Sequence, residues 1–166
     1  ETWISSNLKA QQDINNKALW VNNDGTVIYT QTDKFYRSLD GGENWVEIPG
    51  VGCNTLAFDP QNTSIAYCGM GNIIQKTINN GDTWQEIGRP DTWSSSLVVS
   101  PHNQNMLFIG GAGLFGSLDG GDTWTEFSNG LGASNLEMKL DPINQSTIYA
   151  QNYCELFIST DSGNQW

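Results

Sequence analysis

The chain has 166 residues, of which 37% are hydrophobic and 18 are glycine. This composition is typical of one globular domain and argues against a wholly disordered chain. Seven lysine and arginine residues against 18 aspartate and glutamate residues give a net charge of −11. Nucleic acids and anionic membranes attract proteins through cationic side chains, so the charge argues against both as partners. No apolar run approaches the length of a membrane helix, and no membrane insertion is expected.

A motif with the pattern S/T-x-D/N-x-G-x-x-W occurs four times along the chain, and the four copies align with one another without gaps. Its four closing tryptophans follow one another at intervals of 39, 40 and 42 residues, and Glu1–Trp3 looks like the tail of an earlier copy. A fixed period of about 40 residues indicates a repeat architecture. The sequence predicts a single domain over 1–166, or part of one, with repeats at about 4–45, 46–84, 85–124 and 125–166. The motif positions are Ser38, Asp40, Gly42, Trp45; Thr77, Asn79, Gly81, Trp84; Ser117, Asp119, Gly121, Trp124; and Ser159, Asp161, Gly163, Trp166.

The repeats read as four short strands each. In the first, the turn residues 23–25 precede a β-rich run at 27–29. The second repeat shows the full set: strands near 55–58, 64–68 and 73–77, then an outer strand at 84–87 in which apolar and polar residues alternate. β-rich runs follow at 106–109 and 147–150, and outer runs with the same alternation occur at 45–48 and 124–127. After Trp166 the corresponding outer strand is missing, and no helical period of useful length occurs. The sequence therefore predicts an all-β fold, a β-propeller with about four blades of four antiparallel strands.

The motif has a local structural explanation. Its Ser or Thr ends the third strand, its Asp or Asn accepts backbone N–H bonds in the turn, and its Gly supplies a positive φ. The tryptophan opens the fourth strand, and we expect it to be buried between neighbouring blades. The expected role of the motif is architectural.

This motif resembles the Asp-box, or BNR repeat, of sialidases, xyloglucan-active glycoside hydrolases, sortilin-type receptors and photosystem II assembly propellers. The resemblance covers essentially the whole chain and implies a propeller, but enzymes and non-enzymes share the repeat. Sialidases bind their substrate's carboxylate with three arginines, whereas this chain has only Arg37 and Arg89. A complete sialidase site is therefore excluded. The xyloglucan-active relatives imply a pair of catalytic aspartates, which the sequence alone does not single out among 18 carboxylates.

The sequence gives little support for a catalytic histidine, a phosphate-binding site or a metal site. The single histidine, His102, lies in a turn, and no phosphate-binding motif or clustered metal ligands occur. No catalytic residue, cofactor or metal is predicted.

Among the three cysteines, Cys53 and Cys68 fall at nearby levels of two neighbouring strands. Two buried free thiols are favoured there over a disulfide, because antiparallel strands make such a bond awkward.

The resemblance implies that a ligand binds at the face carrying the loops that enter each inner strand and those joining the second and third strands. The motifs lie on the other face. On the ligand-binding face Trp93 stands out, because its position does not fit the regular spacing of the motif tryptophans. The alternative is that Trp93 fills a local core. The candidate ligand-binding residues are Arg89, Asp91, Trp93, Tyr153 and Glu155.

The leading functional hypothesis is a non-catalytic recognition or scaffold module, extracytoplasmic, that binds a protein or a glycan. The alternative is a segment of a glycoside hydrolase, xyloglucanase-like or sialidase-like, whose catalytic carboxylates lie partly outside this chain. A facing acidic pair in the central channel would favour the enzyme, and a channel without one would favour binding. The chain is expected to be part of a longer propeller; closure of a four-bladed ring, or pairing of two half-rings, is the alternative.

Overall fold

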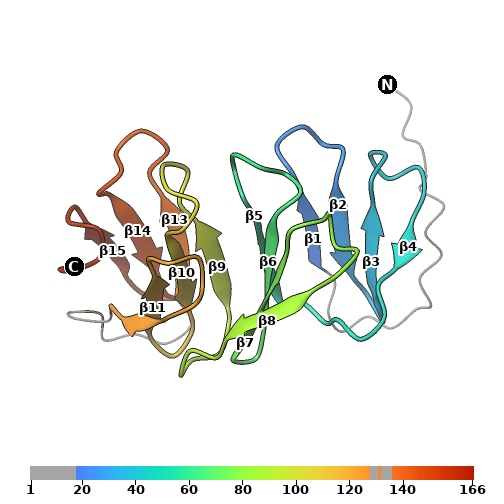
Figure 1. Ribbon diagram of the computed structural model, residues 1–166. Coiled ribbons are helices and arrows are strands. Elements are labelled where there is room, and N and C mark those ends of the chain that lie inside the picture. Colours follow the sequence, from blue (N-terminus) through green and yellow to red (C-terminus); the bar gives the residue numbers. More distant parts are fainter. Residues whose placement is uncertain (1–17, 128–130, 132–135) are drawn as a thin grey trace.

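A computed structural model describes residues 18–127, 131 and 136–166, and the predicted earlier motif tail at Glu1–Trp3 lies outside them. The described residues form four antiparallel sheets, each with its first three strands in one predicted repeat, whereas the outer strands follow the motif tryptophans (Figure 1). None of the described residues is helical, so the described part holds no helix that could cross a membrane. The strands are, in the first sheet, β1 (Ala18–Val21), β2 (Ile28–Gln31), β3 (Phe35–Ser38) and β4 (Val46–Glu47); in the second, β5 (Thr55–Phe58), β6 (Ala66–Met70), β7 (Ile73–Thr77) and β8 (Gln85–Gly88); in the third, β9 (Ser96–Val99), β10 (Leu107–Gly110), β11 (Leu114–Ser117) and β12 (Thr125–Glu126); and in the fourth, β13 (Glu137–Leu140), β14 (Ile148–Gln151) and β15 (Leu156–Ser159).

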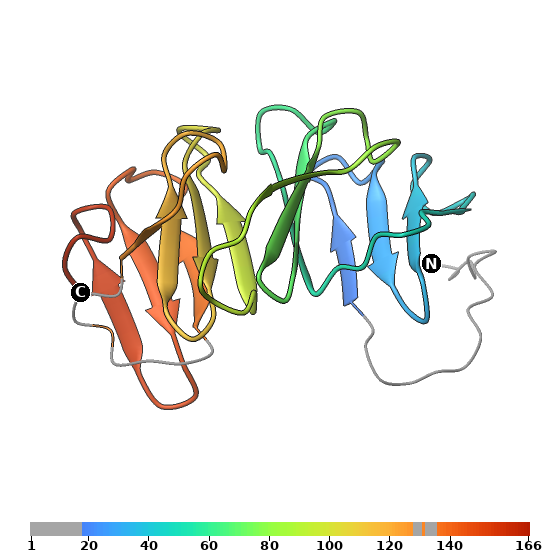
Figure 2. The same cartoon turned by 60° about the horizontal axis from the view of Figure 1, so that its bottom comes forward.

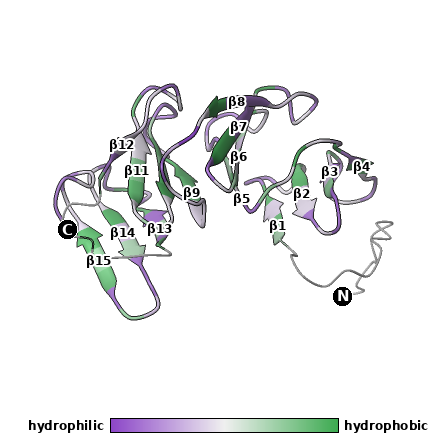
Figure 3. Cartoon of the chain, turned by 90° about the horizontal axis from the view of Figure 1, so that it is seen from below, coloured by the Kyte–Doolittle hydropathy of each residue, from purple (hydrophilic) through white to green (hydrophobic). Residues whose placement is uncertain are grey.

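The sheets are arranged as the blades of a propeller, which confirms the predicted fold class. Strands follow one another in chain order across each sheet, so β1, β5, β9 and β13 are the inner strands. Inner strands of neighbouring blades contact each other, and the four blades follow an open arc (Figures 2 and 3). The fourth sheet has three strands among the described residues. The outer strands β4 and β12 have only two residues, shorter than the four-residue runs predicted, because they pair with β3 and β11 over two positions only.

The repeated turn motif is held by a hydrogen-bond pattern that recurs in each blade. In the first, the Ser38 hydroxyl accepts the N–H of Gly42 at 2.8 Å and donates to Asp40 at 2.8 Å. The Asp40 carboxylate then accepts the N–H of Asn44 at 2.9 Å. The motif glycine has a positive φ, 96° at Gly42 and 104° at Gly121, which favours a residue without a Cβ. These bonds satisfy the polar groups of the turn that joins the third and fourth strands.

The hydrophobic core consists of three clusters, each at the interface between two neighbouring blades. Side chains of β2 and β3 meet those of β5 and β6 in the first cluster, and the other two interfaces repeat this arrangement. The motif tryptophan of each following blade packs against the cluster: Trp84 on the first, Trp124 on the next and Trp166 on the last. These tryptophans are half-buried, so each blade is stabilised mainly by its neighbours.

The expectation of two free thiols at Cys53 and Cys68 is wrong. The two residues form a disulfide with their Cα atoms 5.6 Å apart. Cys53 precedes β5 rather than lying in it, and Leu56 is the residue paired with Cys68 across the sheet. The irregular backbone before the strand lets the Cys53 side chain reach β6 without the constraint of a cross-strand pair. Cys154 is free and exposed.

Candidate functional site

Strand direction divides the loops between two faces of the arc. Every blade is an up-and-down meander, so the loops joining its second and third strands lie at the end where its inner strand begins. The repeated turns that carry the motif lie at the opposite end. We call the first end the loop face; it carries Trp93, just before β9, and Tyr153, between β14 and β15.

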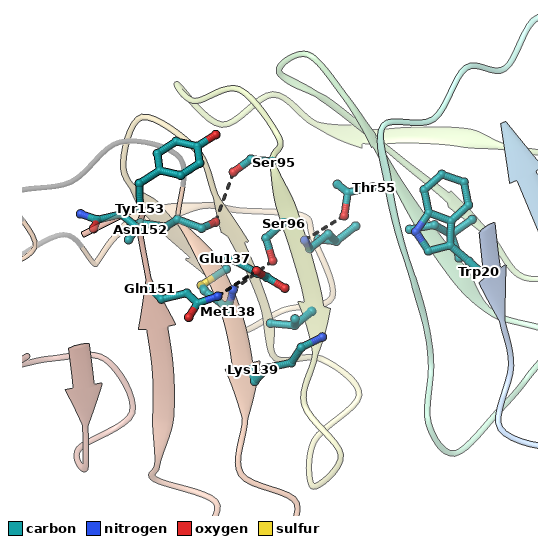
Figure 4. Close-up of a pocket in the computed structure, with 14 residues that line it drawn as sticks. Trp20, Thr55, Ser95, Ser96, Glu137, Met138, Lys139, Gln151, Asn152 and Tyr153 are labelled. Carbon is teal, nitrogen blue, oxygen red and sulfur yellow. Dashed lines mark hydrogen bonds between the residues drawn. The ribbon is translucent and has the colours of Figure 1, made fainter. Parts of the chain in front are cut away.

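A cavity of about 490 Å³ follows the concave side of the arc. Inner strands of all four blades line it, with Trp20 from β1, Thr55 from β5, Ser96 from β9 and Glu137 from β13 (Figure 4). We call it the channel cavity, because its position is that of the central channel of a propeller.

Hydroxyl groups in the channel cavity connect successive blades. Thr55 Oγ1 accepts the backbone N–H of Leu97 at 3.1 Å, and Ser96 Oγ accepts that of Met138 at 3.2 Å. Glu137 occupies the same register in the next blade, and its carboxylate accepts a 3.0 Å bond from Gln151. The two hydroxyl bonds join neighbouring blades, whereas the bond between Gln151 and Glu137 lies within the fourth blade.

Among the described residues lining the channel cavity, Glu137 is the one carboxylate. Lys139 is the one cation, and the other polar side-chain groups are hydroxyls, amides and the indole N–H of Trp20. The described part of the wall therefore does not present the facing pair of carboxyl groups that glycoside hydrolysis needs. The lowered pKa values of Asp40 and Asp119, both about 2, arise in the repeated turns on the far face, from bonds donated by Asn44 and Thr123.

A second cavity, of about 430 Å³, lies on the loop face between the second and third blades. We call it the loop cavity. It is lined by Gly71, Asn72, Asp91, Thr92, Trp93 and Ala112. Trp93 is 74% exposed, so it does not fill a core. The Oγ1 atom of Thr92 is buried and has no hydrogen-bond partner, which leaves a polar group at the cavity wall unsatisfied.

The segment that carries Trp93 is anchored on both sides. Ser94 donates two bonds to the carbonyl of Gly71, from its backbone N–H at 2.7 Å and from its hydroxyl at 2.9 Å. On the other side the Trp93 carbonyl lies so close to Gly111 that any Cβ at 111 would collide with it. The exposed indole is therefore presented by a fixed backbone.

The structure brings only some of the predicted ligand-binding residues together. Asp91 and Trp93 share the loop cavity, whereas Tyr153 lines the channel cavity. Glu155 is exposed in the same turn as Tyr153, where its N–H donates to Asn152 at 2.8 Å. Arg89 is exposed and makes a bidentate ion pair with Glu86, at 2.6 and 2.9 Å.

Sequence reasoning missed Thr92, Asn72 and the wall of the channel cavity. Thr92 and Asn72 lie in loops that carry no motif, so only their neighbourhood to Trp93 pointed to them. The channel wall had a usable signal, because Thr55, Ser96 and Glu137 each begin the inner strand of their repeat. No group of three or more histidine, cysteine, aspartate or glutamate side chains suited to a metal occurs in the described part of the chain.

Comparison with solved structures supports the fold. The chain matches an ancestral GH74 enzyme (TM-score 0.73, 19% identity) over 90% of its own length and 23% of that chain. It matches the GH74 xyloglucanase of Xanthomonas campestris (TM-score 0.73, 18% identity) over 89% of its length and 29% of that chain. The Niastella koreensis GH74 enzyme gives a TM-score of 0.72 at 24% identity, over 89% of this chain and 28% of that one.

The fold is that of β-propeller blades. A structure described as YCF48 bound to a D1 peptide also matches, with a TM-score of 0.56 and 12% identity over 87% of this chain and 57% of that one. No family model and no curated protein sequence matches. The chain spans about a quarter of the GH74 chains, and at these identities the likeness concerns the fold.

Proposed function

We propose that this chain is an extracytoplasmic, non-catalytic segment of an Asp-box propeller that binds a neutral glycan on its loop face. The observation that carries this proposal is the anchored indole of Trp93, which is 74% exposed in the loop cavity. An exposed aromatic ring offers a flat apolar surface to a sugar ring, and the exposed side chains of Asp91 and Asn72 in the same cavity can exchange hydrogen bonds with sugar hydroxyls.

The chemistry of the surroundings favours a neutral ligand. The loop cavity contains one carboxylate, Asp91, and no basic side chain, and the chain carries a net charge of −11. This charge disfavours acidic sugars and phosphorylated ligands through electrostatic repulsion. The amide of Asn72 adds a donor and an acceptor suited to uncharged hydroxyl-rich molecules.

The test is a calorimetric titration of the chain with neutral oligosaccharides from xyloglucan and cellulose. We expect Trp93→Ala to weaken binding about tenfold, a change of about 1.4 kcal/mol, and Trp93→Phe to weaken it less. Ile143→Ala, an exposed apolar residue between β13 and β14 at the opposite face, is the matched control and should leave the affinity unchanged. Equal affinity of Trp93→Ala and the unaltered chain would refute the site, and binding of a peptide but no oligosaccharide would refute the ligand class.

A glycoside hydrolase segment is the second candidate, favoured by the GH74 matches and by the carboxylate of Glu137 in the channel cavity. In that case the second carboxyl group of the catalytic pair comes from blades outside this chain. The distinguishing experiment uses a complete propeller that contains this segment. Glu137→Gln should abolish release of reducing ends from xyloglucan if the enzyme hypothesis is right, and should leave glycan binding at Trp93 intact in either case.

A further inference from the structure

The repeated turns differ from one another at the second position of the motif. The first three motifs carry a large aliphatic residue there, whereas the fourth carries Thr160. The three aliphatic residues are exposed, Leu39 by 48%, Ile78 by 67% and Leu118 by 61%. Ile78 and Leu118 belong to blades that have a described neighbour on each side. Their exposure is therefore a property of the turn and does not come from an end of the arc.

The sixth position of the motif changes together with the second. It is acidic in the first three motifs, as Glu43, Asp82 and Asp122, and it is an amide, Asn164, in the fourth. All three acidic residues are exposed. The four motif turns, at 38–45, 77–84, 117–124 and 159–166, contain no lysine, arginine or histidine. An aliphatic side chain and a carboxylate thus occur together at these two positions in three turns, and the fourth turn has neither.

The hydrogen bonds of the turn require neither residue. In the fourth motif the Ser159 hydroxyl accepts the N–H of Gly163 at 2.8 Å, and Asp161 accepts the N–H of Gln165 at 2.9 Å. These bonds repeat those of the first motif, so threonine at the second position and asparagine at the sixth preserve the turn. The aliphatic and acidic residues of the other three turns therefore call for an explanation beyond the fold, and exposed apolar side chains often mark interaction surfaces.

The first three turns lie next to one another along the arc. Arg37, directly before the first motif, donates from its guanidinium to the carbonyl of Asn80 and to Asp82 in the second turn, the latter at 2.8 Å. Lys76, directly before the second motif, places its Nζ 3.8 Å from the position of a Cβ at Gly120 in the third turn. Neighbouring turns therefore approach each other in the same way at both interfaces. We define the motif-face row as the aliphatic and acidic residues of these three turns: Leu39, Ile78, Leu118, Glu43, Asp82 and Asp122.

We propose that the motif-face row binds a basic segment of a partner protein that also carries aliphatic side chains. The partner's aliphatic side chains cover Leu39, Ile78 and Leu118, and its lysine or arginine side chains face the carboxylates of the same turns. Charge complementarity selects this partner, because the turns carry carboxylates and no basic side chain in a chain with a net charge of −11. The row lies on the face opposite the loop cavity, so this binding is independent of the glycan site.

The test is a titration of a fluorescently labelled peptide, with the repeat Leu-Lys-Gly-Lys, with the full 166-residue chain. The triple variant Leu39→Thr, Ile78→Thr, Leu118→Thr gives the first three turns the residue of the fourth and leaves the net charge unchanged. We expect this variant to weaken binding about tenfold, a loss that non-specific attraction of opposite charges does not explain. Trp93→Ala is the control on the loop face and should leave the affinity for the peptide unchanged. Far-UV circular dichroism checks that every variant is folded.

A second set of variants tests the carboxylates of the row. The double variant Glu43→Gln, Asp122→Asn should weaken peptide binding more than Asp33→Asn, Glu155→Gln, which removes as many negative charges from the loop face. Added salt should weaken binding to the unaltered chain. The double variant Thr160→Leu, Asn164→Asp extends the row to the fourth turn and should strengthen binding severalfold.

Three outcomes would overturn this proposal. They are no binding of the peptide to the unaltered chain, equal affinity of the triple threonine variant and the unaltered chain, and equal binding of a peptide with glutamate in place of lysine. Peptide binding without binding of any oligosaccharide would refute the glycan site alone, because the two surfaces lie on opposite faces.

Discussion

The indole ring of Trp84 meets the phenol ring of Tyr29 nearly at right angles, with ring centroids 5.8 Å apart, although the two residues belong to neighbouring blades. Trp84 also lies edge-on to Phe35, at 6.0 Å. At the last interface, Trp166 donates from its ring nitrogen to the carbonyl of Phe127 in the preceding blade, at 3.1 Å. The tryptophans of the second, third and fourth motifs thus connect their own blades to the ones before them.

Replacing Trp84 by alanine should destabilise the chain through this interface. Loss of a large ring that contacts two buried aromatic residues leaves a cavity, and we expect a decrease of about 3 kcal/mol in the free energy of unfolding. Trp93→Ala is the matched control, because the same substitution on the exposed loop face should cost less than about 0.5 kcal/mol. Urea unfolding followed by circular dichroism measures both. Equal losses in the two variants would contradict the connecting role of Trp84.

The glycine of the third motif should tolerate a side chain less well than a glycine in open space. Gly121 has a φ of 104°, and a Cβ there would collide with Ile87 of the preceding blade. Gly50 has a φ of 76° and nothing within 4 Å of the position of a Cβ. Gly50→Ala therefore isolates the backbone cost, about 1–2 kcal/mol. Gly121→Ala should lose about 1–3 kcal/mol more in the same unfolding experiment, because it adds overpacking. If Gly50→Ala and Gly121→Ala lose the same free energy of unfolding, the contact with Ile87 does not contribute to the difference.

The sequence predicted those parts of the fold that depend on local patterns. The strand predicted at 73–77 coincides with β7, and that at 55–58 with β5, because turns and alternation mark short strands directly. The disulfide between Cys53 and Cys68 was missed because it depends on the path of an irregular segment before β5. The unpartnered hydroxyl of Thr92 was missed for a similar reason, since its burial depends on how the loop before β9 packs against Gly111. The exposure of Trp93, by contrast, agrees with its position outside the repeat phase.

Acid should destabilise the chain partly through the motif aspartates. The hydroxyl and N–H of Thr123 and the hydroxyl of Ser117 lower the pKa of Asp119 to about 2 in the folded chain. The pKa of an unfolded aspartate is about 3.9. A lowered folded-state pKa stabilises the fold above about pH 4, and this contribution is lost as the pH falls toward about 2. The bonds from Asn44 and Ser38 lower the pKa of Asp40 to about 2 in the same way.

The second motif supplies the control for this prediction. Asn79 occupies the aspartate position there and accepts the N–H of Thr83 at 3.0 Å, so an amide preserves the turn. The double variant Asp40→Asn, Asp119→Asn should therefore stay folded at neutral pH and lose less stability between about pH 4 and pH 2.5. Asn79→Asp should lose more over the same interval. Unfolding free energies at each pH provide the measurement, and an unchanged acid dependence in the double variant would show that these carboxyl groups do not contribute.

Reduction of the disulfide should loosen the second blade. The bond joins Cys53 and Cys68 across a sequence separation of 15 residues, and a closed loop of this size stabilises a folded chain by about 3 kcal/mol. Both cysteines are buried at the first blade interface, so the effect should extend to the packing against Tyr29. Thiol labelling of the denatured, unreduced chain should detect one free cysteine, Cys154, and labelling after reduction should detect three. Dithiothreitol should lower the melting temperature of the unaltered chain and of Cys154→Ser, but not that of the double variant Cys53→Ala, Cys68→Ala. Three reactive thiols before reduction would contradict the bond.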